Sequence, residues 1–308
     1  MKLRPDRSPA ATLPRVCVVC GHALDGAGQV RTASVHLYRC AECEAWSSHP
    51  RVEASRQAAR HDSEQYFEHP YLRRRREQFE RADARCREVF ERLSCAVDIG
   101  SLRGQRLLDV GCDTGQFLAC AARRFGIRPV GVDVAARAVE IAAAAGIEAY
   151  HTTMEDAPAR LAGFPVITAI DVIEHVADPA RFLRDIRGRL AGGGAAYVET
   201  PNIRSAVYSL GRALCGVARG RPEAVFRRLF PPEHVQYFTA ASLRRLAADA
   251  GLEMVRLGRR TLPTRDIAVG LPVRAALGLI QAADRLAGRE ILIWAVLRAP
   301  APGNGARP

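Results

Sequence analysis

The sequence has 308 residues, 48% of them hydrophobic, and is long enough to form one large core with a small second unit beside it. Arg274 interrupts the best candidate for a membrane helix, residues 267–283, and residues 1–14 lack the apolar run of a secretory signal, so we expect a cytoplasmic protein. The net charge of +12 comes from arginine, because Lys2 is the only lysine, and it favours anionic partners without selecting among phosphorylated compounds, membranes and RNA.

Two closely spaced cysteine pairs lie near the N-terminus. The first is Cys17 and Cys20, and the second, Cys40 and Cys43, follows after 19 intervening residues. Two such pairs can bring four thiolates to one tetrahedral Zn²⁺, and because four protein ligands leave no open position, the zinc is expected to be structural. The alternative is four unrelated buried thiols. We interpret residues 1–60 as a small zinc-binding module.

An arginine-rich linker follows at residues 61–100. Residues 71–93 contain no proline and place opposite charges four residues apart, as in Arg73 and Glu77. This pattern predicts a solvated amphipathic helix. Four apolar side chains would form its buried stripe: Phe79, Val89, Phe90 and Leu93.

Residues 101–300 have the pattern of an α/β domain, in which short apolar runs alternate with helical segments. The predicted strands are residues 106–110, 128–133, 166–171 and 195–200. The predicted helices are residues 116–125, 135–145 and 179–190, the last with Asp178 as its N-cap. Strict alternation implies parallel strands joined by right-handed crossovers. We therefore predict a doubly wound, mostly parallel Rossmann-like sheet, which binds ligands at the carboxyl ends of its strands.

Residues 203–232 break this alternation, and we expect them to form an irregular basic lid. Six arginines and one glutamate give this insert a local charge of 6 − 1 = +5. A second regular unit follows, in which Thr239 caps a helix that ends at Gly251. Three further predictions complete the chain: strands at residues 252–257 and 291–297, and a disordered tail at residues 301–308.

The first predicted strand ends in a glycine-containing turn that runs from Asp109 through Gly111 to Gly115. Glycines at such a turn let the backbone approach a ligand closely, and the first amides of the following helix can donate hydrogen bonds to it. Asp133 ends the next strand, where a carboxylate can accept both ribose hydroxyls of a nucleoside. Its alternative role is to cap the helix that follows.

With these motifs, residues 105–257 resemble the class I S-adenosylmethionine-dependent methyltransferases. The resemblance is to the branch that contains ubiquinone-biosynthesis O-methyltransferases and methylases of glycan and natural-product clusters. It rests on five blocks in order: residues 109–115, Asp133, residues 170–176, 199–202 and 233–239. The resemblance implies S-adenosylmethionine as cofactor, held by Asp109, Gly111, Gly115, Asp133, Met154 and Ile170.

Three positions depart from the family's pattern. Asp113 replaces the middle glycine of the turn, which aspartate tolerates because it can adopt left-handed backbone conformations. Pro165 replaces the aspartate that opens the fourth strand and removes a backbone amide there. Thr153 replaces an acid near the adenine. These departures keep open a catalytically inactive protein that senses the cofactor or serves as a docking surface.

Methyl transfer from a sulfonium is an in-line displacement, so the enzyme mainly has to orient the acceptor. A hydroxyl acceptor also needs a base, and histidine suits this role near neutral pH. His175 and His234 are the candidates for this base. The alternative is that both histidines are structural, His175 at a turn and His234 as a hydrogen-bonded buried side chain.

The leading hypothesis is a methyltransferase that acts on a hydroxyl of a small-molecule, glycan or lipid-linked acceptor, with peripheral membrane contact through the lid. The first alternative is an RNA base methyltransferase, whose zinc module and positive face would bind phosphates. Against it, the block from Asp171 to His175 differs from the Asn/Asp-Pro-Pro-aromatic turn of many amino-group methylases.

Overall fold

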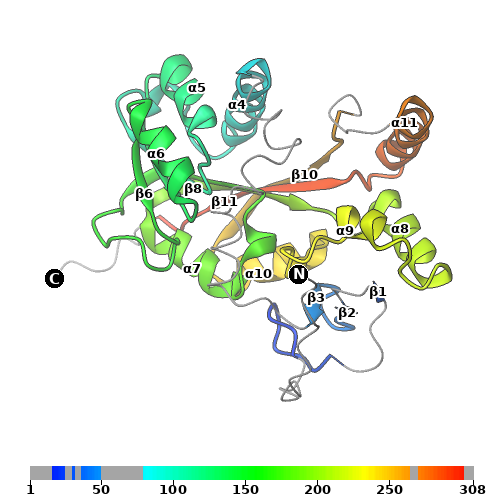
Figure 1. Ribbon diagram of the computed structural model, residues 1–308. Helices are drawn as coiled ribbons and strands as arrows, with labels where there is room; N and C mark the ends of the chain where they lie inside the picture. The colour runs from blue at the N-terminus through cyan, green and yellow to red at the C-terminus, as the bar shows by residue number, and fades with distance from the viewer. Residues whose placement is uncertain (1–15, 25–29, 32–35, 50–78, 264–269, 302–308) are drawn as a thin grey trace, which may run out of the picture.

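The computed structural model describes residues 16–24, 30–31, 36–49, 79–263 and 270–301. They form a seven-stranded sheet with helices on both faces and, below it in Figure 1, a four-stranded sheet. Among these residues, no helix is both long and apolar enough to cross a membrane. The predicted tail lies outside the described residues from residue 302 onward.

The seven-stranded sheet has the order β10-β11-β8-β7-β4-β5-β6. Five of its strands run parallel: β4 (Arg106–Val110), β5 (Arg128–Asp133), β6 (Glu148–His151), β7 (Phe164–Ile170) and β8 (Leu190–Pro201). Two strands at one edge are antiparallel to their neighbours: β11 (Leu292–Arg298) and β10 (Glu253–Arg260). This order confirms the predicted doubly wound, mostly parallel sheet. The chain reverses direction across the sheet between β4 and β7, which is where such sheets open a crevice for ligands.

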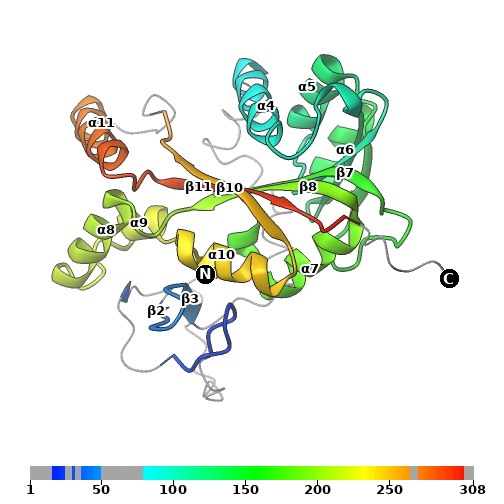
Figure 2. The same cartoon turned by 180° about the vertical axis from the view of Figure 1, so that it is seen from behind.

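Helices cover the two faces of this sheet (Figures 1 and 2). One face carries α4 (Phe79–Leu93), α5 (Gln116–Phe125) and α6 (Ala136–Ala144), and the other carries α7 (Pro179–Arg189) and α10 (Ala240–Asp249). Two short 3₁₀ turns, η1 (Gly100–Leu102) and η2 (Ile173–His175), precede β4 and follow β7. Each face of the sheet therefore has its own hydrophobic core.

The predicted helix caps are confirmed. The side chain of Asp178 accepts a hydrogen bond from the backbone amide of Arg181 at 2.9 Å, at the start of α7. Thr239 forms a capping box with Ser242, in which each side chain accepts a hydrogen bond from the backbone amide of the other residue. Gly251, at φ +70°, follows α10 in the left-handed conformation that a helix end favours.

The linker helix is described from residue 79 onward, and the predicted part at residues 71–78 lies outside the described residues. Val89, Phe90 and Leu93 are buried, which confirms the predicted stripe as far as its side chains are described. Phe90 stacks on Phe125 of α5 with 3.9 Å between ring centroids. The helix is therefore docked onto the sheet domain and is not solvated on all sides.

The expectation that residues 203–232 are irregular is wrong, because most of them are helical, whereas their role as a lid stays a prediction. They contain α8 (Ala206–Val217) and α9 (Glu223–Leu229). Gly211 has a packing role, since a Cβ there would lie 1.8 Å from Leu229 Cδ2. A further helix, α11 (Leu271–Leu286), was not predicted and packs against α8. The buried carboxylate of Asp284 in α11 accepts a hydrogen bond from the backbone amide of Ala206, at the start of α8.

The zinc-binding module shares its sheet with the larger domain. Its strands β1 (Val30–Arg31), β2 (His36–Arg39) and β3 (Trp46–His49) are antiparallel, and β3 also pairs antiparallel with β9 (Gln236–Tyr237) of the larger domain. Ser47 Oγ donates a hydrogen bond to Gln236 Oε1 at 2.9 Å. The boundary predicted at residue 60 lies outside the described residues, and the described residues on its two sides share hydrophobic clusters.

Candidate functional site

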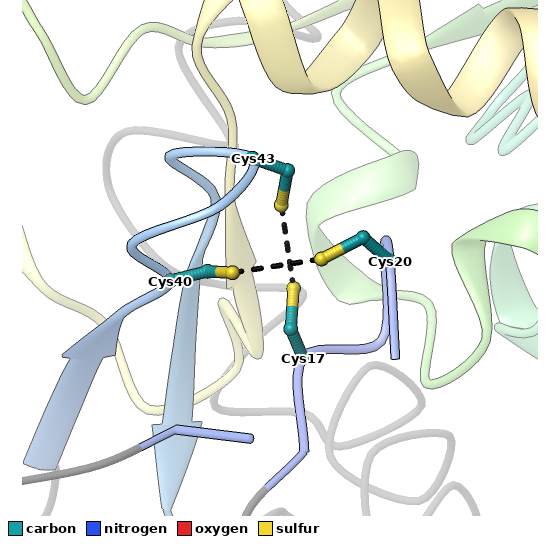
Figure 3. Close-up of side chains that lie close together, drawn as sticks. All are labelled: Cys17, Cys20, Cys40 and Cys43. Atoms are coloured by element: carbon teal, nitrogen blue, oxygen red, sulfur yellow. Dashed lines mark hydrogen bonds between the residues drawn. The ribbon is translucent and has the colours of Figure 1, made fainter. Parts of the chain in front are cut away.

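The four cysteines of the two pairs meet at one point between the module and α10 (Figure 3). Cys17 Sγ lies 3.5 Å from Cys43 Sγ, and Cys20 Sγ lies 3.5 Å from Cys40 Sγ. All four sulfurs lie within 4.8 Å of one another. A zinc ion with Zn–S bonds of about 2.3 Å separates its sulfurs by about 3.8 Å, so this arrangement fits tetrahedral Zn²⁺.

Each cysteine pair lies on a tight turn. The amide of Gly21 donates to the Cys17 carbonyl at 2.8 Å, and the amide of Glu44 donates to the Cys40 carbonyl at 3.1 Å. Both turn residues are left-handed, with φ of +73° at Gly21 and +62° at Glu44. A hydrogen bond from Cys43 lowers the pKa of the Cys17 thiol to about 5, because the pair shares one proton. Such a thiol readily becomes the thiolate that a metal binds.

The glycine-containing turn connects β4 to α5 at the carboxyl edge of the sheet. Gly111 and Gly115 have φ of +74° and +77°. Side chains cannot be added there, since a Cβ would lie 2.5 Å from Val172 at Gly111 and 2.2 Å from Ile147 at Gly115. Asp113 adopts the left-handed conformation expected of it, at φ +48°. The turn therefore keeps its left-handed backbone conformation with aspartate at its centre in place of glycine.

Asp133, at the end of β5, lies directly against this turn. Its Oδ2 accepts a hydrogen bond from the amide of Asp113 at 2.8 Å. Its Oδ1 accepts a hydrogen bond from the amide of Ala135, the N-cap residue of α6, at 2.9 Å. The N-cap residue of α6 is Ala135, so neither of these two bonds shows Asp133 as the helix cap. Each carboxylate oxygen has two lone pairs and can accept more than one hydrogen bond.

The other predicted cofactor residues lie around the same edge. Asp109 is buried in β4 and accepts a hydrogen bond from Thr168 of β7 at 2.5 Å. Met154 is buried in the loop after β6, and Ile170 ends β7 half-buried. With Gly111, Gly115 and Asp133, these residues lie at or just beyond the carboxyl ends of four neighbouring parallel strands, β7, β4, β5 and β6, so the structure brings the predicted set to one edge of the sheet.

Two of the three departures from the family's pattern are accommodated locally. Pro165 lies where the register between β7 and β8 shifts, so its missing amide interrupts an already irregular ladder. Thr153 Oγ1 donates to Asp156 Oδ2 at 2.9 Å, and the amide of Asp156 donates back to Thr153 Oγ1 at 3.1 Å. A carboxylate is therefore present three residues beyond the position where the family has its acid.

The two predicted catalytic histidines lie together. His175 ends η2, directly after β7, and His234 precedes β9; their rings meet edge to face with centroids 4.7 Å apart. His175 Nδ1 lies 3.0 Å from the carbonyl oxygen of Glu233. Because a carbonyl only accepts hydrogen bonds, Nδ1 carries the proton and the lone pair is on Nε2.

Glu174 completes this group and was missed by the sequence analysis. It is buried, and Thr200 Oγ1 donates to its Oε2 at 2.9 Å. Burial raises the pKa of this carboxyl well above its usual value, and the charge of Asp171 adds to the effect. One ligand atom from each of Glu174, His175 and His234 lies within 4.8 Å of the others, a donor set able to relay a proton or bind a divalent metal.

Arg85 of α4 was also missed. Its side chain is 16% exposed, and its guanidinium forms an ion pair with the buried carboxylate of Glu199 in β8. Within the described part of the chain, no group accepts a hydrogen bond from its other terminal nitrogen, Nη1. The sequence holds a signal for this, because Arg85 lies four residues before Val89 and thus on the apolar side of the helix.

Comparisons with known proteins agree with this geometry. Residues 71–257 match a family model described as a methyltransferase domain. The ubiquinone biosynthesis O-methyltransferase of Leptothrix cholodnii is 28% identical over 51% of this chain and 67% of that protein. The enzyme of the same name from Ruegeria pomeroyi is 33% identical over 51% of this chain and 65% of its own length. The chain thus spans about two thirds of the length of these relatives.

One solved structure that is similar to this chain supports its fold and carries no conclusion about its function. It is phosphoethanolamine N-methyltransferase 2 of Haemonchus contortus, in complex with phosphomonomethylethanolamine and S-adenosylhomocysteine. It is 14% identical to this chain, with a TM-score of 0.54, and the match covers 84% of this chain and 62% of that one.

Proposed function

Because the chain belongs to the S-adenosylmethionine-dependent methyltransferases, we propose that it methylates a hydroxyl of a small-molecule, glycan or lipid-linked acceptor. The observation that carries the proposal is the pairing of His175 with His234 beside buried Glu174. This group follows β7, at the edge of the sheet where the glycine-containing turn and Asp133 also lie. The relatives named as O-methyltransferases support a hydroxyl as the acceptor.

The predicted residues have consistent roles toward S-adenosylmethionine, which when bound supplies an electrophilic methyl group. Asp133 would accept the ribose hydroxyls, and Asp109 and Gly111 would flank the methionine end. Met154 would contact the adenine and Ile170 the sulfonium side. We add Arg85, because its buried Nη1 has no acceptor within the described part of the chain and suits the cofactor's carboxylate.

The acceptor has to lose its hydroxyl proton as its oxygen attacks the methyl carbon. The Glu233 carbonyl fixes the proton of His175 on Nδ1, which leaves the basic lone pair on Nε2. His234 packs against that ring and limits its orientation. Orientation of this kind contributes strongly to a displacement reaction, because the reacting atoms must be in line.

Binding of S-adenosylhomocysteine tests the cofactor site. Asp133→Ala is expected to weaken this binding by about 1.5 to 3 kcal/mol, the usual contribution of charge-assisted hydrogen bonds. Isothermal calorimetry measures the affinity, and Glu140→Ala, which removes an exposed carboxylate from α6, is the matched control. An unchanged affinity in Asp133→Ala would mean that the ribose is held elsewhere.

Labelled S-adenosylmethionine, incubated with separate RNA, lipid and small-molecule extracts, tests the acceptor. Label is expected in the small-molecule or lipid fraction. His175→Ala is expected to lower the rate about 100- to 10,000-fold, the range of a general base, while S-adenosylhomocysteine still binds. Label found only in RNA would contradict the proposal and favour the RNA methyltransferase alternative.

The surface formed by α8 and α11 supports a lipid-linked acceptor and peripheral membrane contact. Leu214 and Val217 of α8 are 52% and 87% exposed, and Leu279 and Leu286 of α11 are 75% and 92% exposed. The following helix, α9, has arginines in its last turn. Exposed apolar side chains beside arginines suit an anionic lipid surface.

We also propose that Cys17, Cys20, Cys40 and Cys43 hold a structural Zn²⁺. The four sulfurs are spaced for tetrahedral coordination, and three of the four side chains are buried. With four protein ligands, such an ion contributes to folding and takes no part in the reaction.

A further inference from the structure

A cavity separate from the predicted cofactor site lies between the zinc-binding module and the N-terminus of α10. Its volume is about 230 Å³. Its walls come from the turn after Cys43, the segment after β8, the start of α10, β10 and the segment between α11 and β11. Four separate parts of the methyltransferase domain thus meet the module at this cavity.

The charged side chains of this cavity are strongly unbalanced. Four arginines line it, namely Arg204, Arg244, Arg259 and Arg289. Glu44 is the only acidic residue among the lining residues, so the lining carries a net charge of 4 − 1 = +3. Guanidinium groups bind phosphate oxygens in pairs of parallel hydrogen bonds, which makes a phosphoryl group the best-matched ligand.

The one acid offsets only part of this charge, because its carboxylate is shared between Arg204 of the lining and Arg39 outside it. Glu44 Oε1 accepts hydrogen bonds from Arg39 at 2.9 Å and from Arg204 at 3.0 Å, and its Oε2 accepts from Arg204 at 2.9 Å. Arg204 is further fixed by its backbone amide, which donates to the buried Asn202 side chain at 3.2 Å. Arg244 and Arg259 add two further positive charges to the lining.

Backbone groups add to the positive potential. Ala240 and Ala241 line the cavity and form the first turn of α10, a helix of ten residues. The capping box uses the amide of Ser242, whereas the amides of Ala240 and Ala241 belong to the helix positions that have no partner inside the helix. The partial positive charge at a helix N-terminus favours an anion at this position.

The turn that holds Cys40 and Cys43 also contributes Glu44 to the lining of this cavity. Glu44 follows Cys43 directly and adopts a left-handed conformation, with its amide bound to the Cys40 carbonyl. The turn that holds two of the four thiols therefore also sets the direction of the Glu44 carboxylate, which in turn orients Arg204.

We propose that this cavity binds a phosphoryl group of the acceptor. This assignment of the acceptor rests on the proposed methyltransferase function, whereas phosphate binding itself does not. His234 and Thr239, which precedes α10, are five residues apart, so their Cα atoms are separated by at most about 17 Å. An acceptor that contacts both the cavity and His234 would therefore span at most about 17 Å between these two backbone positions.

Calorimetry of the full-length protein with inorganic phosphate and with pyrophosphate, at constant ionic strength, tests the site. Arg244→Ala is expected to weaken binding about tenfold, because it removes a charged hydrogen-bond donor. Arg245→Ala is the matched control, since this neighbouring side chain pairs with Asp249 at 2.8 Å. Absence of phosphate binding, or equal binding by Arg244→Ala and the wild type, would overturn the proposal.

A second arm separates the acceptor's phosphate from a free phosphate ion. The small-molecule and lipid extracts are treated with phosphatase before incubation with labelled cofactor. Loss of the labelled product after this treatment is expected, whereas undiminished labelling would show that the acceptor carries no required phosphate and would overturn the assignment. Failure of the methyltransferase function is distinguishable, because untreated extracts would then remain unlabelled while inorganic phosphate still bound.

Discussion

Removal of zinc is expected to unfold the zinc-binding module and to have the largest effect on stability of any change to this chain. Structural zinc sites contribute an apparent binding free energy of about 10 to 16 kcal/mol at pH 7 in small zinc-finger peptides. Cys40→Ser is expected to remove most of this contribution. Metal analysis should give about one zinc per chain for the wild type and much less for the variant.

The shared sheet predicts how far this unfolding spreads. Because β3 pairs with β9 and Trp46 packs in the same cluster as Tyr208 and Phe230, loss of the module exposes aromatic side chains of the larger domain. The unfolding temperature of both parts should therefore fall, and dye binding to apolar surface should rise. Cys95→Ser, at an exposed cysteine outside the cluster, is the matched control. Protein purified without chelator that contains no metal would contradict the zinc assignment.

Glu199→Gln is expected to lower the free energy of unfolding by about 3 to 5 kcal/mol, the usual cost of removing one partner of a buried ion pair. Glu199 is fully buried in β8. Its carboxylate accepts hydrogen bonds from Arg260 at 2.8 and 3.0 Å and from the Tyr197 hydroxyl at 2.7 Å, and it pairs with Arg85 and Arg92. The substitution leaves three cations around a neutral amide. Urea denaturation at pH 7 measures the change.

The exposed ion pair between Glu253 and Arg298 provides the matched control. Glu253 is 60% exposed, and Arg298 donates to it at 2.8 Å. Exposed pairs contribute about 0 to 1 kcal/mol, so Glu253→Gln should change the free energy of unfolding only slightly. Equal effects of the two substitutions would mean that the Glu199 cluster adds little to stability.

The acid stability of the chain gives an independent check on Glu199. Burial alone would raise the pKa of this carboxyl, but Arg85 and Arg260 outweigh it and lower the pKa from 4.5 to about 2. A lowered pKa stabilises the folded state above the unfolded value, so this contribution is complete above pH 4.5 and is lost as the pH falls toward 2. The shift corresponds to about 3 kcal/mol. In Glu199→Gln this part of the pH dependence should be absent.

The central sheet could be predicted because its strands are continuous apolar runs. Residues 106–110 and 128–133 were predicted with the bounds that the structure shows. The strand β6 was not predicted, since its four residues are exposed or half-buried and form no apolar run. The helix α8 was obscured by Gly211, whose role is to admit Leu229 of α9. That contact joins residues far apart in the sequence, and local patterns do not report it.

The candidate site was predicted where chemistry depends on residue type and spacing. The cysteine pairs and the two histidines were identified, and the structure brings each set together. Arg85 was not identified, and Glu199 was named only as part of the block 199–202, because the roles of both depend on a contact across 114 residues. Glu174 was overlooked for a similar reason, since its burial results from packing around η2 and not from its neighbours in sequence.

The pairing of β3 with β9 also constrains the order in which this protein folds during synthesis. Ser47 and Gln236, which bond to each other across the two strands, are 189 residues apart in the chain. At about 5 to 20 residues per second, a ribosome needs roughly 10 to 40 seconds to add those residues. Throughout that interval the outer edge of β3 has no partner strand, and the side chains that later pack beneath it have not been made. The N-terminal end of the chain therefore completes its structure only after most of the methyltransferase domain has left the ribosome.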